Sequence, residues 1–244
     1  MSFDLTNRTA LVTGSTRGIG LALAQALAAA GARVAINGRT AEAVEAVVTR
    51  IEGSVAAPFD ITDEGAVAAA VAALGPVEIL VNNTGMTLRR SLVDLALAEW
   101  RHVLDVNLTS AFLVSRAVVP GMIERGRGKI VNVCSVMSEL ARPTTGAYAA
   151  SKGALKMLTQ SMCAEWAAHG IQANGLAPGY VRTDLNEALQ ADPEFDAWLR
   201  ARVPAGRWAE PGELGGAVVF LASPASDFVN GQLLVVDGVL SAVI

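Results

Sequence analysis

The sequence predicts one α/β domain, residues 1–244, built on a doubly wound parallel sheet with helices on both faces. Short apolar runs rich in β-branched residues alternate along the chain with Ala-rich segments of helical periodicity, which is typical of repeated strand–helix units. The apolar runs are nearly continuous, as expected for strands covered on both faces. Hydrophobic residues make up 52% of the chain and charged residues 17%, so a large core can form and disorder is not expected.

The first half of the chain predicts four strands separated by three helices, and Gly31 is expected to end the first helix. The strands are expected over residues 9–14, 33–38, 54–60 and 77–83, and the helices over 20–31, about 41–51 and 63–74.

The second half continues the alternation with right-handed crossovers. Two long helical stretches are expected around residues 98–125, helices over 147–166 and about 211–222, and strands over 129–135, 171–179 and 233–238. The polar segment 182–210 contains tryptophans and is expected to form a lid that closes over substrate.

The charge balance argues against nucleic acid or an anionic membrane as the main partner. The net charge is −4, and no block of Lys and Arg exceeds two adjacent residues. The N-terminus lacks the pattern of a signal peptide, and no run of about 18 apolar residues occurs. Cys134 and Cys163 are too few for a disulfide framework and, with His102 and His169, lack metal-ligand spacing. A cytoplasmic protein without a metal site is therefore expected.

A glycine-rich turn lies between the first strand and the first helix. The stretch LVTGSTRGIG places Gly14, Gly18 and Gly20 there. Glycines permit the tight turn, and the helix N-terminus offers free N–H groups and partial positive charge to a pyrophosphate. The spacing is G-x-x-x-G-x-G instead of the more general G-x-G-x-x-G, but the position still predicts nucleotide binding.

The end of the second strand indicates which nucleotide binds. An acidic residue there favours the free ribose hydroxyl of NAD, whereas a nearby arginine accommodates the 2′-phosphate of NADP. This chain has Asn37 and Arg39 at that point, no acid, and Arg17 inside the glycine turn. NADP is therefore favoured over NAD.

Tyr148 and Lys152 lie four residues apart in the helix expected over 147–166 and so share one face. A tyrosine with a pKa of about 10 is a poor acid or base at neutral pH, but a nearby ammonium favours the phenolate and lowers that pKa. Such a phenol could exchange a proton with an alcohol while hydride leaves its carbon. Ser135 follows a strand at the edge of the sheet where ligands bind, and could hydrogen-bond the substrate oxygen.

Several motifs appear together in one order: TGSTRGIG, NNTG, Asn107, Ser135, YAASK and LAPGYVRT. In this combination the whole chain resembles the short-chain dehydrogenase/reductase superfamily, which implies a Rossmann fold. The resemblance implies that Tyr148 is the general acid/base and that Ser135 orients the carbonyl or hydroxyl. It also implies that Lys152 binds the nicotinamide ribose and lowers the pKa of Tyr148, while Asn107 holds a water of a proton relay.

The same resemblance implies a wider set of cofactor contacts. Asp60 would contact adenine, Asn82 and Gly85 would shape the floor of the cofactor site, and Thr183 would meet the carboxamide. The further positions implied are Ser15, Thr16, Ile19, Ile61, Pro178, Gly179 and Val181. The chain departs from the family pattern at Thr84, where alanine is more usual, and at Val239, where glycine is usual and the C-terminal turn or subunit contacts could change.

The segments TLRRS, EWRHVLDVNLT, FDAWLRARVPAGRW and SDFVNG, together with the long stretch around YAASK, resemble the gluconate 5-dehydrogenase group more closely. That resemblance implies reversible oxidation of D-gluconate at C5 with NADP, and a homotetramer. A sugar acid needs a cation, because arginine can hold a carboxylate bidentately. The candidate substrate contacts are Arg89, Arg90, Arg142, Glu139, Tyr180 and Trp198, besides Ser135 and Tyr148.

Two alternatives stay open from the sequence. Another reductase of the same fold, acting on a 3-oxoacyl thioester, a ketosteroid or a neutral polyol, would share the cofactor half. A regulator that binds NADP without turnover is a different class of protein, but it would have no need of Ser135, Tyr148, Lys152 and Asn107.

Overall fold

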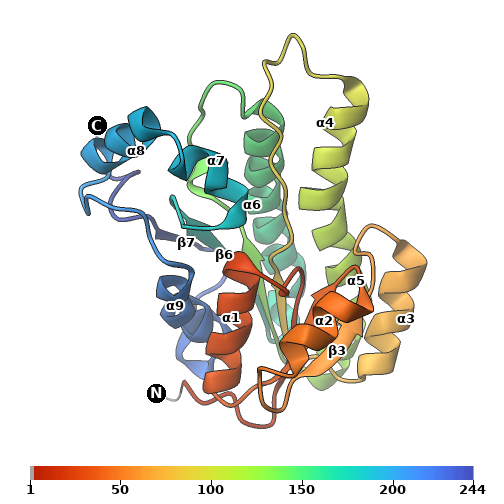
Figure 1. Cartoon of the computed structure of the whole chain (residues 1–244). Helices are drawn as coiled ribbons and strands as arrows, with labels where there is room; N and C mark the ends of the chain where they lie inside the picture. Colours follow the sequence, from red (N-terminus) through yellow and green to blue (C-terminus); the bar gives the residue numbers. More distant parts are fainter. Residues whose placement is uncertain (1–2, 244) are drawn as a thin grey trace.

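The computed structural model describes residues 3–243, and its centre is a seven-stranded parallel sheet (Figure 1). The strand order is β3-β2-β1-β4-β5-β6-β7, so the chain reverses direction across the sheet between β1 and β4, as in a doubly wound fold. The strands are β1 (Thr9–Val12), β2 (Arg33–Gly38), β3 (Val55–Pro58), β4 (Ile79–Asn82), β5 (Gly128–Val133), β6 (Ile171–Pro178) and β7 (Leu233–Val236). The expected fold class is confirmed.

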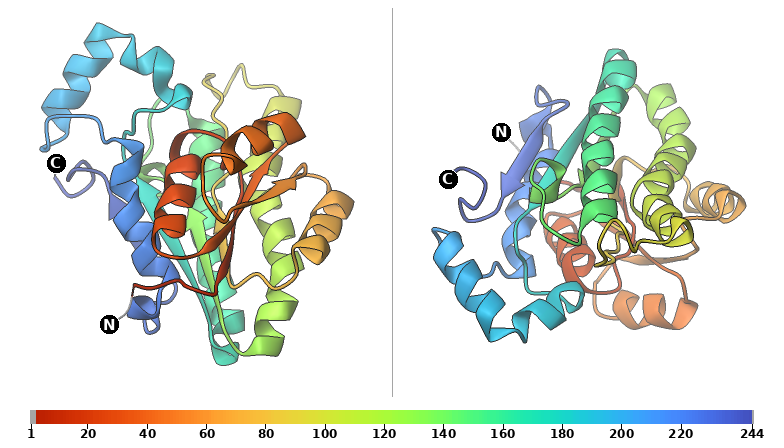
Figure 2. Two further views of the ribbon diagram at one scale, coloured as in Figure 1. Left: turned by 60° about the horizontal axis from the view of Figure 1, so that its bottom comes forward. Right: turned by 90° about the horizontal axis from the view of Figure 1, so that it is seen from above.

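Helices cover both faces of the sheet (Figure 2). On one face the apolar sides of α1 (Gly18–Ala29), α2 (Ala41–Val48) and α9 (Gly215–Ala222) share a buried cluster with the strands. On the other face α3 (Glu64–Leu74), α5 (Ser110–Arg125) and α6 (Gly146–Trp166) form a second cluster with the same strands. Each strand is therefore buried on both sides, which explains its continuous apolar sequence.

The two helical stretches expected around residues 98–125 are one continuous helix. It consists of α4 (Leu97–Leu104), a π-helical turn η1 (Asp105–Thr109) and α5. No glycine or proline separates the parts, so nothing in the local sequence ends the helix. An 18-residue window has a mean hydropathy of 1.4, enough for a membrane span by length and composition, although no fully apolar run was expected. Several of its apolar residues pack in the core, among them Val114, Val118 and Met122.

The carboxyl ends of β1, β4, β5 and β6 meet at one edge of the sheet, where the expected site residues follow them. The segment 182–210 lies over this edge and contains η4 (Asp184–Asn186), α7 (Glu187–Gln190) and α8 (Pro193–Arg202) (Figure 1). This segment has a small core of its own, made of Val136, Leu189, Phe195, Leu199, Val203, Trp208 and Leu240. It is a packed helical layer on the sheet rather than an irregular loop.

Candidate active site

The glycine turn after β1 has the shape of a phosphate cradle. Gly14 has φ +60°, and a Cβ on Gly20 would lie 2.3 Å from the carbonyl oxygen of Gly14, so only glycine fits there. Helix α1 begins at Gly18 without a side-chain hydrogen bond from its N-cap. Its first N–H groups are therefore available to an anion, and this loop fits the pyrophosphate of a dinucleotide.

Asn37 supports this loop from inside the protein and does not face the ribose site as the sequence suggested. The side chain is 1% exposed; its Oδ1 accepts from Gly14 N at 3.1 Å, and its Nδ2 donates to the carbonyls of Ala57 and Phe59. Ser15 is equally internal, since its hydroxyl donates to Val12 O. Asn37 thus ties the loop to β3, and its two amide hydrogens are already used.

The neighbouring strand β4 braces the loop from the other side. Asn83 donates to the carbonyls of Thr13 and Gly14, and Thr13 Oγ1 accepts from the N–H groups of Asn83 and Thr84. The hydroxyl of Thr84 is buried beside Gly14 with no hydrogen-bond partner among the described residues. No sequence pattern identifies Thr13 as a support, because its role arises from pairing across the sheet.

Two cations flank the mouth of the cradle, as expected. Arg39 lies close enough to Asp60 to help lower the pKa of that carboxyl, after the larger effect of the hydrogen bonds from Thr62. Arg17 lies 3.6 Å from Asp184 at the start of the 182–210 segment, with both side chains mostly exposed. The acid that would mark an NAD site is absent from the end of β2. The guanidinium groups of Arg17 and Arg39 therefore fit a cofactor with an additional phosphate.

The other expected cofactor positions divide into surface and interior. Thr183 lies beside Gly18, since a Cβ on Gly18 would be 3.6 Å from the Thr183 methyl group, and Thr16 packs beside Gly38 in the same way. Pro178 and Gly179 form the end of β6. Ile61, Val181 and Asn82 are buried, and Ile19 packs against the core, so their side chains support the site. Asn82 Nδ2 donates to Ser115 and Asn132 inside the sheet.

Ser135, Tyr148 and Lys152 come together where β5 ends and α6 begins. Lys152 is 3% exposed; its Nζ donates to Val133 O at 2.6 Å and lies 5.8 Å from the centre of the Tyr148 ring. Burial lowers the pKa of Lys152 to about 8. The amine therefore still carries a proton at neutral pH but releases it more readily than an exposed lysine.

The expected lowering of the Tyr148 pKa by Lys152 is not found in the protein by itself. Burial raises the pKa of Tyr148, and the contact that lowers it is a hydrogen bond with the Ser135 side chain. Lys152 Nζ donates its hydrogen bond to Val133 O and not to the phenol, and its charge is not among the causes that shift the pKa of Tyr148. The Tyr148 phenol is therefore protonated at neutral pH.

The π-helical turn η1 directs Asn107 toward the same place, as such turns often do at functional sites. Its Oδ1 accepts from Met86 N, and its Nδ2 donates to Met86 O and to Ser151 Oγ. A Cβ added to Gly85 would lie 3.4 Å from Lys152 Nζ and 3.5 Å from Asn107 Oδ1, so a side chain at this position would crowd both polar atoms. Ser151, which lies inside the motif YAASK, also donates to Tyr148 O.

Two of the three expected substrate arginines, Arg89 and Arg142, are neighbours of Tyr180. Arg142 donates to Tyr180 Oη at 3.3 Å, and its guanidinium stacks 4.3 Å from the centre of the Phe195 ring. Desolvation and the Arg142 charge lower the pKa of Arg89, and the Tyr180 side chain raises it, so Arg89 is a neighbour of both. Tyr180 in turn lies close enough to Tyr148 to help raise its pKa.

The other polar candidates have partners of their own. Arg90 lies 3.2 Å from Glu99, and Glu139 lies 2.6 Å from Lys156. In residues 3–243, by contrast, no carboxylate lies within ion-pair distance of Arg89 or Arg142. Trp198 belongs to the aromatic group around Tyr180, at 6.2 Å between ring centres. Phe195 was not expected, because only the folded segment brings it over Arg142.

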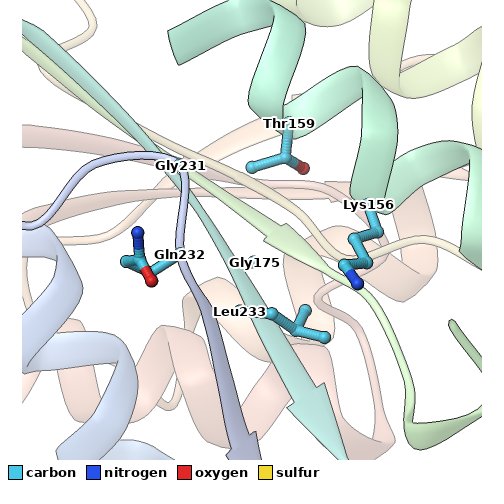
Figure 3. Close-up of a pocket in the computed structure, with 6 residues that line it drawn as sticks. All are labelled: Lys156, Thr159, Gly175, Gly231, Gln232 and Leu233. Atoms are coloured by element: carbon cyan, nitrogen blue, oxygen red, sulfur yellow. The ribbon is translucent and has the colours of Figure 1, made fainter. Parts of the chain in front are cut away.

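No group of three metal-ligating side chains gathers anywhere in the described chain. A small hollow at the sheet edge between α6 and β7 lies outside the site. Its lining residues, shown in Figure 3, are Lys156, Thr159, Gly175, Gly231, Gln232 and Leu233. The candidate catalytic and binding residues therefore lie at the carboxyl edge of the sheet.

The comparisons with known proteins agree with this geometry. A family model described as enoyl-(acyl carrier protein) reductase matches residues 14–240. The chain belongs to the short-chain dehydrogenase/reductase family. It is an oxidoreductase that acts on CH–OH groups, as expected from the combined motifs. The match shows the family and does not show that this chain reduces enoyl groups.

Individual relatives of the short-chain dehydrogenase/reductase family are similar over nearly the whole chain. Gluconate 5-dehydrogenase of Gluconobacter oxydans is 50% identical, covering 97% of this chain and 95% of its own. The 5-keto-D-gluconate 5-reductase of Escherichia coli K12 is also 50% identical, covering 97% and 96%. The crystal structure of a gluconate 5-dehydrogenase from Burkholderia cenocepacia J2315 in complex with NADP and tartrate is 51% identical, with a TM-score of 0.97 and coverage of 100% and 98%.

Proposed function

We propose that this short-chain dehydrogenase/reductase interconverts D-gluconate and 5-keto-D-gluconate with NADP as cofactor. The observation that carries the proposal is the pair Arg89 and Arg142, two neighbouring cations beside Tyr180 without a carboxylate partner in the described chain. Two like charges held together favour an anion between them, and arginine matches a carboxylate. The names of the relatives at about 50% identity support the same substrate.

The cradle after β1 and the cations Arg17 and Arg39 would hold NADP. The nicotinamide ring supplies or accepts the hydride when the cofactor is bound. The glycine turn binds the pyrophosphate through N–H groups, and Arg39 neutralises the additional phosphate at the ribose. Thr183 borders the glycine turn, and Gly85 borders Lys152. Both residues line the part of the cleft next to the reacting groups.

Tyr148 moves the proton of the reaction. In ketone reduction its phenol, protonated at neutral pH, donates to the forming C5 alkoxide; in alcohol oxidation the phenolate takes that proton back. Ser135 shares a hydrogen bond with the phenol and orients the substrate oxygen. Lys152, whose pKa is about 8, stabilises the phenolate once it forms, and the free lone pair of Asn107 Oδ1 is available for a relay water.

The 182–210 segment is proposed to act as the lid within the single domain. It contributes the aromatic rings that hold Arg142 and begins beside the phosphate loop at Thr183 and Asp184. Equal hydrogen-exchange rates in this segment with and without NADP and substrate would contradict a closing motion.

A homotetramer in the cytoplasm is proposed as the working form, with no nucleic acid or membrane partner. Exposed apolar side chains on α5 and α6, namely Phe112, Ile123 and Met157, and the unpaired outer edge of β7 offer surfaces for self-association. Both cysteines are free, which fits a reducing compartment. Light scattering should give four times the mass of one chain.

The substrate assignment is tested by NADPH absorbance with a panel of 5-keto-D-gluconate, a neutral ketose and an acetoacetyl thioester. Arg89→Ala should raise KM for 5-keto-D-gluconate about 10- to 100-fold, because a charge-assisted hydrogen bond contributes about 1.5–3 kcal/mol. The same variant should leave the neutral ketose unaffected. Arg90→Ala is the matched control, because its guanidinium already pairs with Glu99.

Catalysis is tested with Tyr148→Phe, which should lower kcat by orders of magnitude and leave NADP affinity intact. A wild-type protein that reduces the thioester or the neutral ketose but not 5-keto-D-gluconate would overturn the substrate. A Tyr148→Phe variant with an undiminished rate would overturn the role of the phenol.

A further inference from the structure

The last turn of the chain packs into the core of the 182–210 segment. Leu240 is 5% exposed and belongs to the same buried cluster as Phe195, Leu199 and Val203. Two hydrogen bonds join the same parts: Ala205 N donates to Gly238 O at 3.2 Å, and the Arg202 side chain donates from Nη2 to Val243 O at 2.9 Å. Residues 238–243 accordingly lie beside α8 (Figure 1).

The turn that carries Leu240 is held in an unfavourable backbone conformation. Gly238 and Val239 both have positive φ, +64° and +78°, and this region is rarely populated by a β-branched residue. The carboxylate of Asp237 accepts from the N–H groups of Val239 and Ser241 and from the Ser241 hydroxyl. Such strain persists only where surrounding contacts fix it, so the position of Leu240 is strongly determined.

Contact between the turn and the segment is concentrated in a few groups. A cavity of about 140 Å³ separates the end of β7 from the stem of the segment, and its lining includes Tyr180, Val203, Arg207 and Asp237. Beside this cavity, the turn meets the segment through Leu240, through the two hydrogen bonds, and through Gly238, on which a Cβ would lie 2.9 Å from Ala205 and 3.0 Å from Val203. The Arg207–Glu213 ion pair beside the cavity is internal to the stem.

The 182–210 segment connects Leu240 with Arg142, the proposed substrate contact. Phe195 shares the buried cluster with Leu240, and its ring lies 4.3 Å from the Arg142 guanidinium. Phe195 also packs against Tyr180, at 5.5 Å between ring centres, and Tyr180 accepts the hydrogen bond from Arg142. One packed cluster therefore links Leu240 with Phe195, and Phe195 contacts Arg142.

We infer that Leu240 is a positioning residue for the substrate carboxylate: the C-terminal turn fixes α8, and α8 fixes Arg142. This rests on the proposed function of Arg142. Within residues 3–243, no hydrogen bond joins residues 238–243 to the phosphate loop or to Tyr148. Loss of Leu240 therefore weakens the binding of an acidic substrate and leaves cofactor binding and proton transfer unchanged.

The test compares Leu240→Ala with wild type in 5-keto-D-gluconate reduction. KM should rise at least 5-fold, kcat should stay within 3-fold, and the Kd of NADPH from fluorescence titration should stay within 2-fold. In an Arg142→Ala background, Leu240→Ala should raise KM no further, because the group it positions is gone. An unchanged KM, an equal loss of NADPH affinity, or multiplicative effects in the double variant would overturn the inference.

Two controls separate positioning from general loss of stability. Leu221→Ala removes a leucine that is 1% exposed in the α1–α9 core, and it should leave KM unchanged although it destabilises the protein. Val243→Ala changes an exposed side chain on the same turn while keeping the backbone contact, and it should behave as wild type. A rise in KM for Leu221→Ala equal to that for Leu240→Ala would refute a specific role.

A further measurement needs no substrate. Hydrogen exchange of residues 193–203 in the ligand-free protein should be faster in Leu240→Ala than in Leu221→Ala. If wild type does not reduce 5-keto-D-gluconate, the proposed substrate fails while this exchange still tests the contact between turn and α8. Equal exchange in the two variants would refute the contact itself. If Leu240→Ala does not fold, Arg202→Ala replaces it in this test, because that change removes the donor to Val243 O. Residues 193–203 should then exchange hydrogen faster in Arg202→Ala than in wild type. Unchanged exchange would equally refute the contact.

Discussion

Replacing Asn37 with aspartate distinguishes a ribose contact from an internal support. If Asn37 faced the ribose, the new carboxylate would favour NAD and leave stability unchanged. The structure predicts the opposite outcome. Aspartate can still accept from Gly14 N but cannot donate to the carbonyls of Ala57 and Phe59, and its charge would be buried beside them.

The size of this effect follows from the lost donors. Each buried acceptor left without a partner costs about 1–3 kcal/mol, so Asn37→Asp should lose about 4 kcal/mol. At about 2–4 °C per kcal/mol for a chain of this length, the melting temperature falls by about 8–16 °C. Differential scanning fluorimetry measures that fall, and NADP and NAD titrations measure the preference.

Arg39→Asp is the matched comparison, because Arg39 is exposed at the next position but one. It should melt within about 2 °C of wild type, as surface charges contribute little, and weaken NADP at least 10-fold while sparing NAD. If Asn37→Asp melted like wild type and switched the preference to NAD, the internal role of Asn37 would be refuted.

Three further outcomes are expected. Ketone reduction needs the Tyr148 phenol protonated, and burial raises the pKa of Tyr148, so the rate of reduction should be flat from pH 6 to 8. Alcohol oxidation needs the phenolate, so its rate should rise with pH. A falling rate of oxidation would contradict this. Val239→Gly should stabilise the protein by about 1 kcal/mol, because glycine adopts φ +78° without strain, and a lower melting temperature would argue against strain there. Asp184→Asn removes a carboxylate 3.6 Å from Arg17, so NADP should bind about 2- to 5-fold tighter at low salt, and this gain in affinity should shrink at high salt. If the variant and wild type bound NADP with equal affinity, Asp184 would not compete with the cofactor for Arg17.

The order of elements and the catalytic residues could be predicted because both depend on local sequence. Continuous apolar strands, Ala-rich helices and glycine turns place each strand end, and parallel pairing brings those ends to one edge. Ser135 follows from that rule, whereas Tyr148 and Lys152 are identified by their helical spacing and by the family resemblance; the structure places the three together. The π-helical turn around Asn107 could not be predicted, because a single extra residue in a helix has no sequence pattern of its own.

What the sequence by itself determined is the fold class, the family and the chemical groups at the edge of the sheet. Only the tertiary structure decided how those groups are used, because hydrogen-bond partners and burial depend on contacts between distant segments. It turned Asn37 inward, paired Arg90 with Glu99, and left Arg89 and Arg142 side by side. It also surrounded the Tyr148 phenol, so that burial outweighs the hydrogen bond with the Ser135 side chain and raises the pKa of Tyr148.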